Sequence, residues 1–166
     1  MDRVPITPAG ATRMQAEVQY LKEVLRPKIV RDIEEARAHG DISENSEYED
    51  AKHRQGMCEG KIAELTSQLA RIEIIDVTRL PQNGRVVFGS TVELEDTETG
   101  EIVTYQIVGV FEADVKLGLI SVSSPIGKAL IGKNKDDEVT VQTPKGTRRF
   151  VINDVRYVAA EPPTAR

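Results

Sequence analysis

The chain has 166 residues, of which 39% are hydrophobic, 30% are charged and only 4% are aromatic. Its formal net charge is −5, and neither half has the positive excess with which a protein holds a phosphate backbone by itself. The charge therefore argues against free DNA or RNA as the primary ligand. The single cysteine, Cys58, excludes a disulfide framework and a cysteine zinc cluster. No apolar run has the length of a signal peptide or a membrane span, so we expect a cytoplasmic protein that binds no membrane.

Residues 1–76 are predicted to form a helical hairpin. Thr7-Pro8 is typical of a helix start, because a capping hydroxyl precedes a proline at the first helical position. Two series of residues, apolar except for Gln55, then recur at intervals of three and four: Ala11, Met14, Val18, Leu21, Leu25, Ile29, Ile33, Ala36; and Tyr48, Ala51, Gln55, Cys58, Ile62, Leu65, Leu69, Ile72. This heptad spacing predicts a coiled-coil seam.

The two series pair in antiparallel order. Residue numbers of partners add up to 83 from Ala11–Ile72 to Leu25–Cys58, and to 84 from Ile29–Gln55 to Ala36–Tyr48. The change by one falls on either side of Pro27, where a missing backbone donor predicts a kink or a one-residue bulge. The turn between the helices is centred near residues 40–44, and Gly40 is a helix breaker there.

This turn is acidic and contains no Lys or Arg. Its carboxylates are Asp41, Glu44, Glu47, Glu49 and Asp50. One interpretation is structural, since Asp41 and Glu44 have the spacing of a capping box and acids suit the first turn of a helix. The other is that Asp41 and Glu44 hold Mg²⁺, which is often bound by one or two carboxylates and a partner's phosphates. The two interpretations are compatible, because a carboxylate has lone pairs for both.

From residue 77 the pattern changes to short β-branched runs separated by Gly, Asp and Pro turns. The predicted strands are 86–88, 91–95, 102–108, 119–122, 139–141 and 149–152, and one helix is predicted at about 125–131. Residues 77–160 are therefore expected to form an antiparallel β domain with one short helix, followed by a tail at 161–166. The predicted fold class is α+β.

Several segments resemble the Gre family of transcript-cleavage factors. Glu35-Ala-Arg-Ala-His-Gly-Asp-Ile-Ser-Glu-Asn-Ser-Glu-Tyr48 resembles the family's tip signature, with Ile42 where leucine is usual. Further matches are Gln55–Gly60, Asp76–Thr78, Asn83–Gly89, Leu119–Ile126 and Leu130–Lys133. The similarity covers nearly the whole chain and is closest to the GreA branch of the family.

The resemblance implies a function in transcription elongation. In this family the hairpin enters the secondary channel of a backtracked bacterial RNA polymerase, while an FKBP-like C-terminal domain binds the enzyme outside. The tip acids help the polymerase to bind its second Mg²⁺ and to cut the nascent RNA. The factor is then not an enzyme by itself and binds no cofactor stably, because the Mg²⁺ is shared with the polymerase. We expect a monomer that reaches DNA and the RNA 3′ end only through the polymerase complex.

The resemblance also implies roles for individual residues. Asp41 and Glu44 occupy the positions of the catalytic acids and of the shared Mg²⁺ ligands. Supporting tip residues are Asn45 and Tyr48, candidate RNA contacts are Arg37 and Lys52, and candidate polymerase contacts are Ser124, Pro125 and Ile126. Each group has a structural alternative: the basic residues can be solvated helix faces, and Ser124 and Pro125 can simply cap and start a helix.

Two other functions remain open on the sequence alone. A regulator could occupy the same channel without promoting cleavage, but such a paralogue should have altered tip acids, whereas Asp41 and Glu44 are intact. A plain coiled-coil adaptor with a β domain would show no effect of Mg²⁺ and no dependence on the charge of the tip.

Overall fold

The computed structural model describes residues 2–39 and 46–159. Contacts divide the chain into two compact units: Thr12–Arg71, called here the hairpin unit, and Met1–Ala11 with Ile72–Arg166, called the β unit. The predicted boundary between the domains, at residue 76, does not coincide with this division. The N-terminal strand pairs with the strand that directly follows the hairpin, and both strands belong to the β unit.

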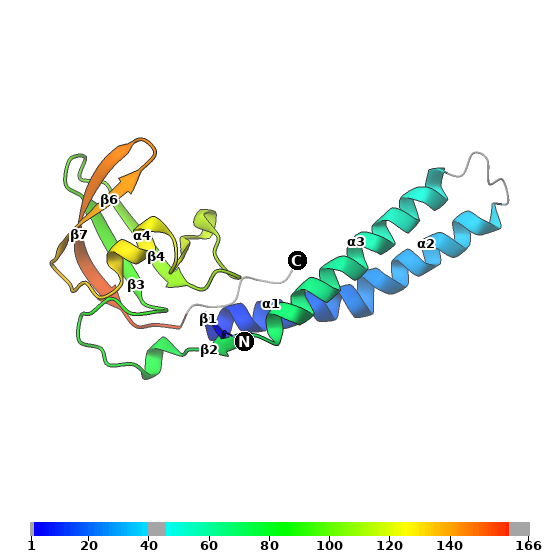
Figure 1. The fold of residues 1–166 in the computed structure, drawn as a ribbon, viewed down its shortest axis with the longest axis horizontal. Helices are drawn as coiled ribbons and strands as arrows, with labels where there is room; N and C mark the ends of the chain where they lie inside the picture. Colours follow the sequence, from blue (N-terminus) through cyan, green and yellow to red (C-terminus); the bar gives the residue numbers. More distant parts are fainter. Residues whose placement is uncertain (1, 40–45, 160–166) are drawn as a thin grey trace. The chain divides into compact units, whose positions relative to one another are not determined.

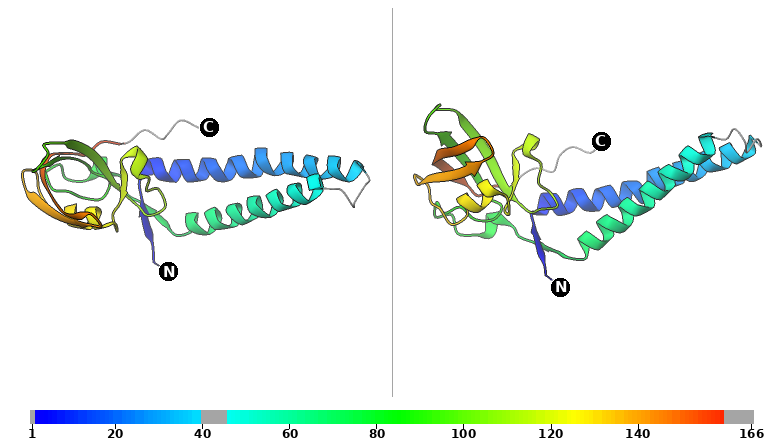
Figure 2. Two further views of the ribbon diagram at one scale, coloured as in Figure 1. Left: turned by 90° about the horizontal axis from the view of Figure 1, so that it is seen from above. Right: turned by 45° about the horizontal axis from the view of Figure 1, so that its top comes forward.

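The hairpin consists of two antiparallel helical arms that lie side by side (Figures 1 and 2). The first arm runs through α1 (Pro8–Tyr20), a π-helical turn (Leu21–Leu25) and α2 (Arg26–Ala38), and the second arm is α3 (Ser46–Leu69). Every residue of the two predicted apolar series is buried or half-buried. The predicted helical hairpin is confirmed, with its first arm ending at Ala38 and its second arm beginning at Ser46.

A one-residue bulge is present as predicted, but it is a π-helical turn at Leu21–Leu25, just before the interval around Pro27 where it was expected. The amide of Arg26 donates to the carbonyl of Leu21, five residues earlier, and a single π turn inserts one extra residue into a helix. Leu21, Leu25, Ile29 and Ile33 follow one another at intervals of four, which would drift around an ordinary helix of 3.6 residues per turn. The wider turn absorbs that drift and keeps the apolar side chains facing α3.

Polar contacts between the arms surround this turn. The Cys58 thiol lies 3.8 Å from the Leu21 carbonyl oxygen, to which it donates, and burial raises the pKa of the thiol. Arg26 donates from Nε and Nη2 to the two carboxylate oxygens of Glu59, at 2.8 and 2.7 Å. Such a forked pair has a defined geometry, and it joins the first arm to α3 beside the π turn.

The second helix ends earlier than the apolar series predicts. α3 stops at Leu69, and Ile72 belongs instead to β2 (Ile72–Ile74), where it pairs in parallel with Val4 of β1 (Val4–Ile6). Placing Ile72 in the helix, as the partner of Ala11, is therefore wrong. The reason is local, since β-branched isoleucines at 72, 74 and 75 favour extended backbone over helix.

Gly56 and Gly60 lie on an exposed face of α3. A methyl group at either position would meet no atom within 4 Å, so packing against the other arm does not require these glycines. Because glycine costs about 1 kcal/mol relative to alanine in a helix interior, we expect Gly56→Ala and Gly60→Ala each to raise the free energy of unfolding by roughly that amount. Urea titration followed by circular dichroism measures the change. Gly127→Ala is the control that should lower stability, since its methyl group would lie 2.2 Å from the Ser121 carbonyl oxygen.

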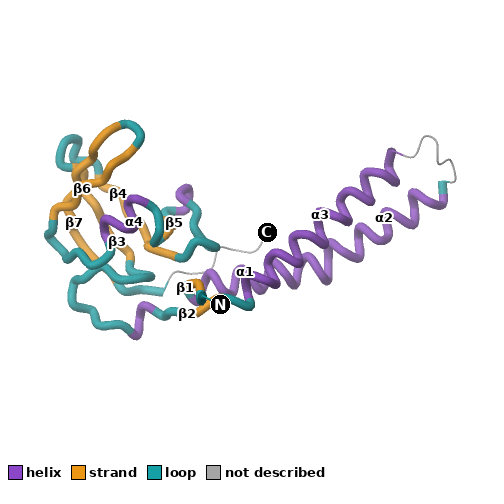
Figure 3. The backbone as a smooth tube through the Cα atoms, viewed as in Figure 1, coloured by secondary structure: helices purple, strands orange, loops and turns teal. Residues whose placement is uncertain are grey.

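The β unit contains a five-stranded sheet in the order β5-β4-β3-β7-β6 (Figure 3). The strands and the one α-helix of this unit after β2 are β3 (Thr91–Asp96), β4 (Ile102–Val108), β5 (Leu119–Ser121), α4 (Pro125–Leu130), β6 (Glu138–Thr143) and β7 (Gly146–Arg156). α4 lies against β6. Side chains from the sheet and from α4 form one core, in which Leu94, Ile107, Leu130 and Ile152 have no exposed surface.

Two details of the predicted β domain are wrong. β4 and β5 pair in parallel, so the sheet is mixed rather than antiparallel. Residues 86–88 are not a strand: a single bridge joins Arg85 to Asn134, and the buried Val86 exchanges backbone hydrogen bonds with Lys133 and Gly132. The predicted fold class, a helical hairpin with a β domain and one short helix, is nevertheless confirmed.

A buried carboxylate ties the N-terminal segment to the β4–β5 connection. Glu112 is 2% exposed and accepts hydrogen bonds from the Thr7 amide at 2.8 Å, the Thr7 hydroxyl and the Gly109 amide at 2.9 Å. The Thr7 hydroxyl also accepts from the Gly10 amide, which caps the start of α1. A side chain on Gly10 would place its Cβ 2.1 Å from a Glu112 oxygen. The short segment before α1 is thus built around this one carboxylate.

Candidate functional site

The tip of the hairpin is bracketed by two helix ends. α2 ends at Ala38 and α3 begins at Ser46. Asp41, Glu44 and Asn45, the principal candidates, lie outside the described residues, so their assignment as catalytic and Mg²⁺-binding residues stays a prediction. The structure describes the two helices that precede and follow the segment with these three residues.

The described candidates near the tip are partly paired with one another. The Arg37 guanidinium lies over the Tyr48 ring, 5.7 Å from its centroid, which brings these residues of α2 and α3 together. Cation–π contacts of this kind hold the arginine in place without neutralising it. Lys52 is exposed on α3, and its ammonium donates to the side chain of Gln55 at 3.1 Å. Both cations lie at the surface, and among the described residues these contacts are with uncharged groups.

Acidic residues below the tip form ion pairs across the arms. Arg54 on α3 donates to Asp32 on α2 at 3.0 Å and to Asp50 on its own helix at 3.1 Å. Hydrogen bonds from Lys28 and then from Arg54 hold the pKa of Asp32 below its usual range. Nearer the tip, the Nδ1 atom of His39 lies 3.6 Å from a Glu47 carboxylate oxygen.

These side chains line an open hollow of about 210 Å³ between the arms. Its lining residues are Asp32, Glu35, Ala36, His39, Glu47, Asp50 and Arg54. Among the described residues, no group of three or more His, Cys, Asp or Glu side chains has the arrangement of a metal site. The Mg²⁺ prediction therefore depends on Asp41 and Glu44 alone, whose carboxylate oxygens are the donor type that Mg²⁺ prefers.

In the β unit, the three candidate docking residues open α4. The Ser124 hydroxyl accepts from the Gly127 amide at 3.1 Å and donates to the Ser121 carbonyl at 2.6 Å, so it is the N-cap of α4. Pro125 is the first helical residue and is exposed, whereas Ile126 is half-buried against the core. Their structural role is thus established, and a contact of this turn with a partner stays a prediction.

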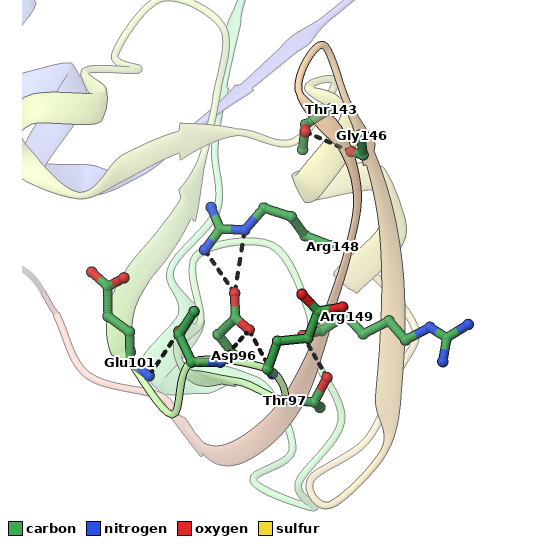
Figure 4. A network of polar contacts seen from close by, with 9 residues as sticks. Asp96, Thr97, Glu101, Thr143, Gly146, Arg148 and Arg149 are labelled. Atoms are coloured by element: carbon green, nitrogen blue, oxygen red, sulfur yellow. Dashed lines mark hydrogen bonds and ion pairs between the residues drawn. The ribbon is translucent and has the colours of Figure 1, made fainter.

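A polar network at the β3–β4 turn was not anticipated from the sequence (Figure 4). Asp96, 5% exposed, accepts from the amides of Glu98 and Thr99 through one oxygen and from Arg148 through the other. The guanidinium of Arg148 also lies over the ring of Phe150, 4.8 Å from its centroid. These contacts hold the β3–β4 turn against the β6–β7 hairpin.

We expect this network to make stability depend on acid pH. The Glu98 amide, then Arg148 and the Thr99 amide, hold the pKa of Asp96 below its ordinary value of 3.8. A carboxylate with a lowered folded-state pKa contributes stability above its ordinary pKa and loses it as the pH falls through the folded-state pKa. Asp96→Asn should lower stability at pH 7 and flatten the fall in melting temperature at acid pH. Glu98→Gln, an exposed change in the same turn, should leave the curve unchanged.

Within the part of the chain that the structure describes, no helix is both long and apolar enough to cross a membrane.

Comparison with known proteins assigns the family. Residues 4–74 match the family model described as "Transcription elongation factor, N-terminal", and residues 81–157 match "Transcription elongation factor, GreA/GreB, C-term". The two matches cover both the hairpin and the five-stranded sheet. The chain belongs to the GreA/GreB family of transcription elongation factors.

Relatives place the chain within that family. It is 54% identical to transcription elongation factor GreA of Methylococcus capsulatus and 51% identical to GreA of Haemophilus influenzae, in each case over 95% of this chain and all of the relative. It is of the GreA type. Among solved structures, GreA factor homolog 1 (Gfh1) of Thermus thermophilus is 32% identical, with 93% of this chain and 99% of that chain covered and a TM-score of 0.40.

Proposed function

We propose that this elongation factor inserts its hairpin into the secondary channel of a bacterial RNA polymerase and stimulates Mg²⁺-dependent cleavage of backtracked nascent RNA. The observation that carries the proposal is the position of the acidic signature. The chain belongs to a family of elongation factors, and its two predicted catalytic acids lie between the end of α2 at Ala38 and the start of α3 at Ser46.

The length of the arms supports insertion into a channel. At 1.5 Å per residue, the first arm from Pro8 to Ala38 spans on the order of 45 Å. Its seam is apolar and its outer faces are charged, so the hairpin presents a hydrated surface along its length. Such an arm carries a few side chains at its end to a place that a globular domain cannot reach.

In this proposal the factor supplies ligands rather than a complete active site. Asp41 and Glu44 contribute carboxylate oxygens to a Mg²⁺ whose other ligands come from the polymerase and the RNA, and they orient the attacking water. Asn45 and Tyr48 support the acids. Arg37 and Lys52, which are exposed on α2 and α3, attract the phosphates near the RNA 3′ end. The bond cleavage itself belongs to the polymerase.

The β unit supplies the attachment outside the channel. Ser124, Pro125 and Ile126 form a rigid turn, because Ser124 caps α4 and Pro125 has a fixed φ, and Pro125 is exposed for contact. We propose that the factor acts as a monomer in the cytoplasm, where it meets polymerase, RNA and DNA in one complex.

A cleavage assay tests the proposal directly. Elongation complexes that carry end-labelled RNA are stalled in a backtracked position and incubated with Mg²⁺, with and without the factor. The proposal expects shortened 5′-labelled RNA to form faster with the factor, and the shortened RNA to be extended when nucleotides are added. Binding without faster cleavage would instead favour a regulator that only occupies the channel.

A further inference from the structure

The apolar seam of the hairpin becomes thinner toward the tip. In the proximal half, seam positions carry large buried side chains such as Met14, Leu21, Ile62 and Leu65. At the tip end, the buried positions include Ala36 and Ala51. Alanine buries far less apolar area than leucine or isoleucine. The apolar contribution to holding the arms together is therefore smallest where the arms carry the tip.

Polar contacts across the arms are gathered in that same region. His39 faces Glu47 at 3.6 Å, and the Arg37 guanidinium lies over the Tyr48 ring. Arg54 joins Asp32 of the opposite arm at 3.0 Å. Together these contacts tie the last two turns of α2 to the first turns of α3. The His39–Glu47 pair flanks residues 40–45 almost directly.

We propose that Asp32, Arg54, His39 and Glu47 are positioning residues, which form a cross-arm frame that holds the two helix ends at the spacing required by Asp41 and Glu44. The inference rests on the proposed function, since it assigns these residues a part in stimulated cleavage. They act through the helix ends and do not touch the reacting atoms.

The expected effects follow from two magnitudes. Exposed ion pairs add little to the free energy of unfolding, and the frame side chains range from 27% exposed at Asp32 to 75% exposed at Glu47. By contrast, displacing a catalytic group by about 1 Å can reduce a rate by roughly 100-fold. Loss of the frame should therefore reduce cleavage much more than stability.

A set of acid-to-amide changes isolates the frame. The test variant is Asp32→Asn with Glu47→Gln, which removes the carboxylates that Arg54 and His39 face across the arms and leaves Asp50, the partner of Arg54 on its own helix, in place. The matched control is Glu59→Gln, which breaks the Arg26–Glu59 pair; this pair also joins the two arms, lies farther from the tip, and has an exposure between those of the two frame pairs. Asp32→Asn leaves both of its cationic partners, Arg54 and Lys28, positively charged, so a loss of cleavage in that single variant is a loss of pairing with Asp32 rather than of a cationic contact with RNA.

Two measurements are made on the full-length protein. The first is the maximal rate of stimulated cleavage at saturating factor, together with the affinity for polymerase. The second is the distribution of distances between spin labels at Ala38→Cys and Glu49→Cys, both exposed positions on opposite arms. The native Cys58 is only 4% exposed and is shielded from the label.

The frame predicts that the double variant loses about tenfold or more of the maximal rate, with affinity and melting temperature nearly unchanged. Its distance distribution should broaden, while that of Glu59→Gln stays narrow and its cleavage rate stays within about twofold of the wild type. Equal rates and equal distributions in the double variant and the control would overturn the inference. If the wild type itself fails to stimulate cleavage, the proposed function is contradicted. In that case the frame is still supported if the distance distribution broadens in the double variant and stays narrow in Glu59→Gln.

Discussion

Asp41→Asn and Glu44→Gln are each expected to reduce stimulated RNA cleavage at least about tenfold while leaving folding and polymerase binding nearly intact. Both changes keep the size of the side chain and remove the charge that a Mg²⁺ ligand needs. Loss of an outer-shell partner of a metal site already costs roughly 10- to 100-fold, and these residues are predicted to be ligands themselves. The measurement is a Mg²⁺ titration of cleavage on backtracked complexes, beside thermal melts of each variant.

The Mg²⁺ titration separates the two interpretations of these acids. If they complete the second metal site, raising the Mg²⁺ concentration should partly restore the single variants by mass action, and the double variant should be inert or inhibitory. A capping role alone predicts instead a loss of about 1 kcal/mol in stability and little loss of cleavage. Glu49→Gln, an exposed acid in the first turn of α3, is the matched control. If both single variants cleave at the wild-type rate at every Mg²⁺ concentration, the two acids are not ligands of the second Mg²⁺.

Glu112→Ala is expected to lower the free energy of unfolding by about 3 kcal/mol. The change leaves the Thr7 and Gly109 amides buried without the oxygen that accepts them, and an unsatisfied buried donor costs roughly 1 to 3 kcal/mol. Glu112→Gln should cost less, since its amide oxygen can still accept. Urea titration of both variants measures the difference. Equal stability of Glu112→Ala and the wild type would show that the hydrogen bonds contribute no net stability.

A double-mutant cycle tests whether Gly10 and Glu112 are energetically coupled. Gly10→Ala must displace Glu112, because the new Cβ would lie 2.1 Å from its oxygen. We expect a large destabilisation in the wild-type background and a much smaller one in Glu112→Ala. Residues in contact show such non-additive effects, whereas independent sites add. Additive losses would mean that Gly10 is constrained by Ile6, the other close neighbour, rather than by Glu112.

The sequence was most informative where one physical rule decides the structure. Apolar spacing located the seam, and the change in the pairing sums indicated one extra residue near Pro27, which the π turn contains a few positions earlier, at Leu21–Leu25. The same rule failed at Ile72, whose position continues the heptad while its β-branched neighbours favour a strand. Apolar spacing indicates that a segment is helical, but it does not determine the residue at which the helix ends.

Contacts between distant parts of the chain could not be predicted in this way. Thr7 and Glu112 are 105 positions apart, and no local pattern marks Glu112 as buried rather than exposed. Likewise, the parallel pairing of β5 depends on how residues 109–118 fold back, with Gly118 at a positive φ of 75°. The cap at Ser124 could be predicted from the local sequence, a serine directly before a proline. The pairing of Arg54 with Asp32 could not, because it depends on how the two arms lie against each other.

The π turn also limits how the hairpin can change in length. The predicted apolar pairs on its two sides differ by one in register, so the extra residue affects the alignment of the distal half, which contains the Arg26–Glu59 and Asp32–Arg54 pairs. A longer or shorter hairpin is therefore obtained most simply by gaining or losing whole seven-residue repeats in both arms at once. A single insertion in one arm rotates the residues beyond it out of phase unless a π turn absorbs it, as the turn at Leu21–Leu25 does. One such repeat changes the length of the hairpin by about 10 Å.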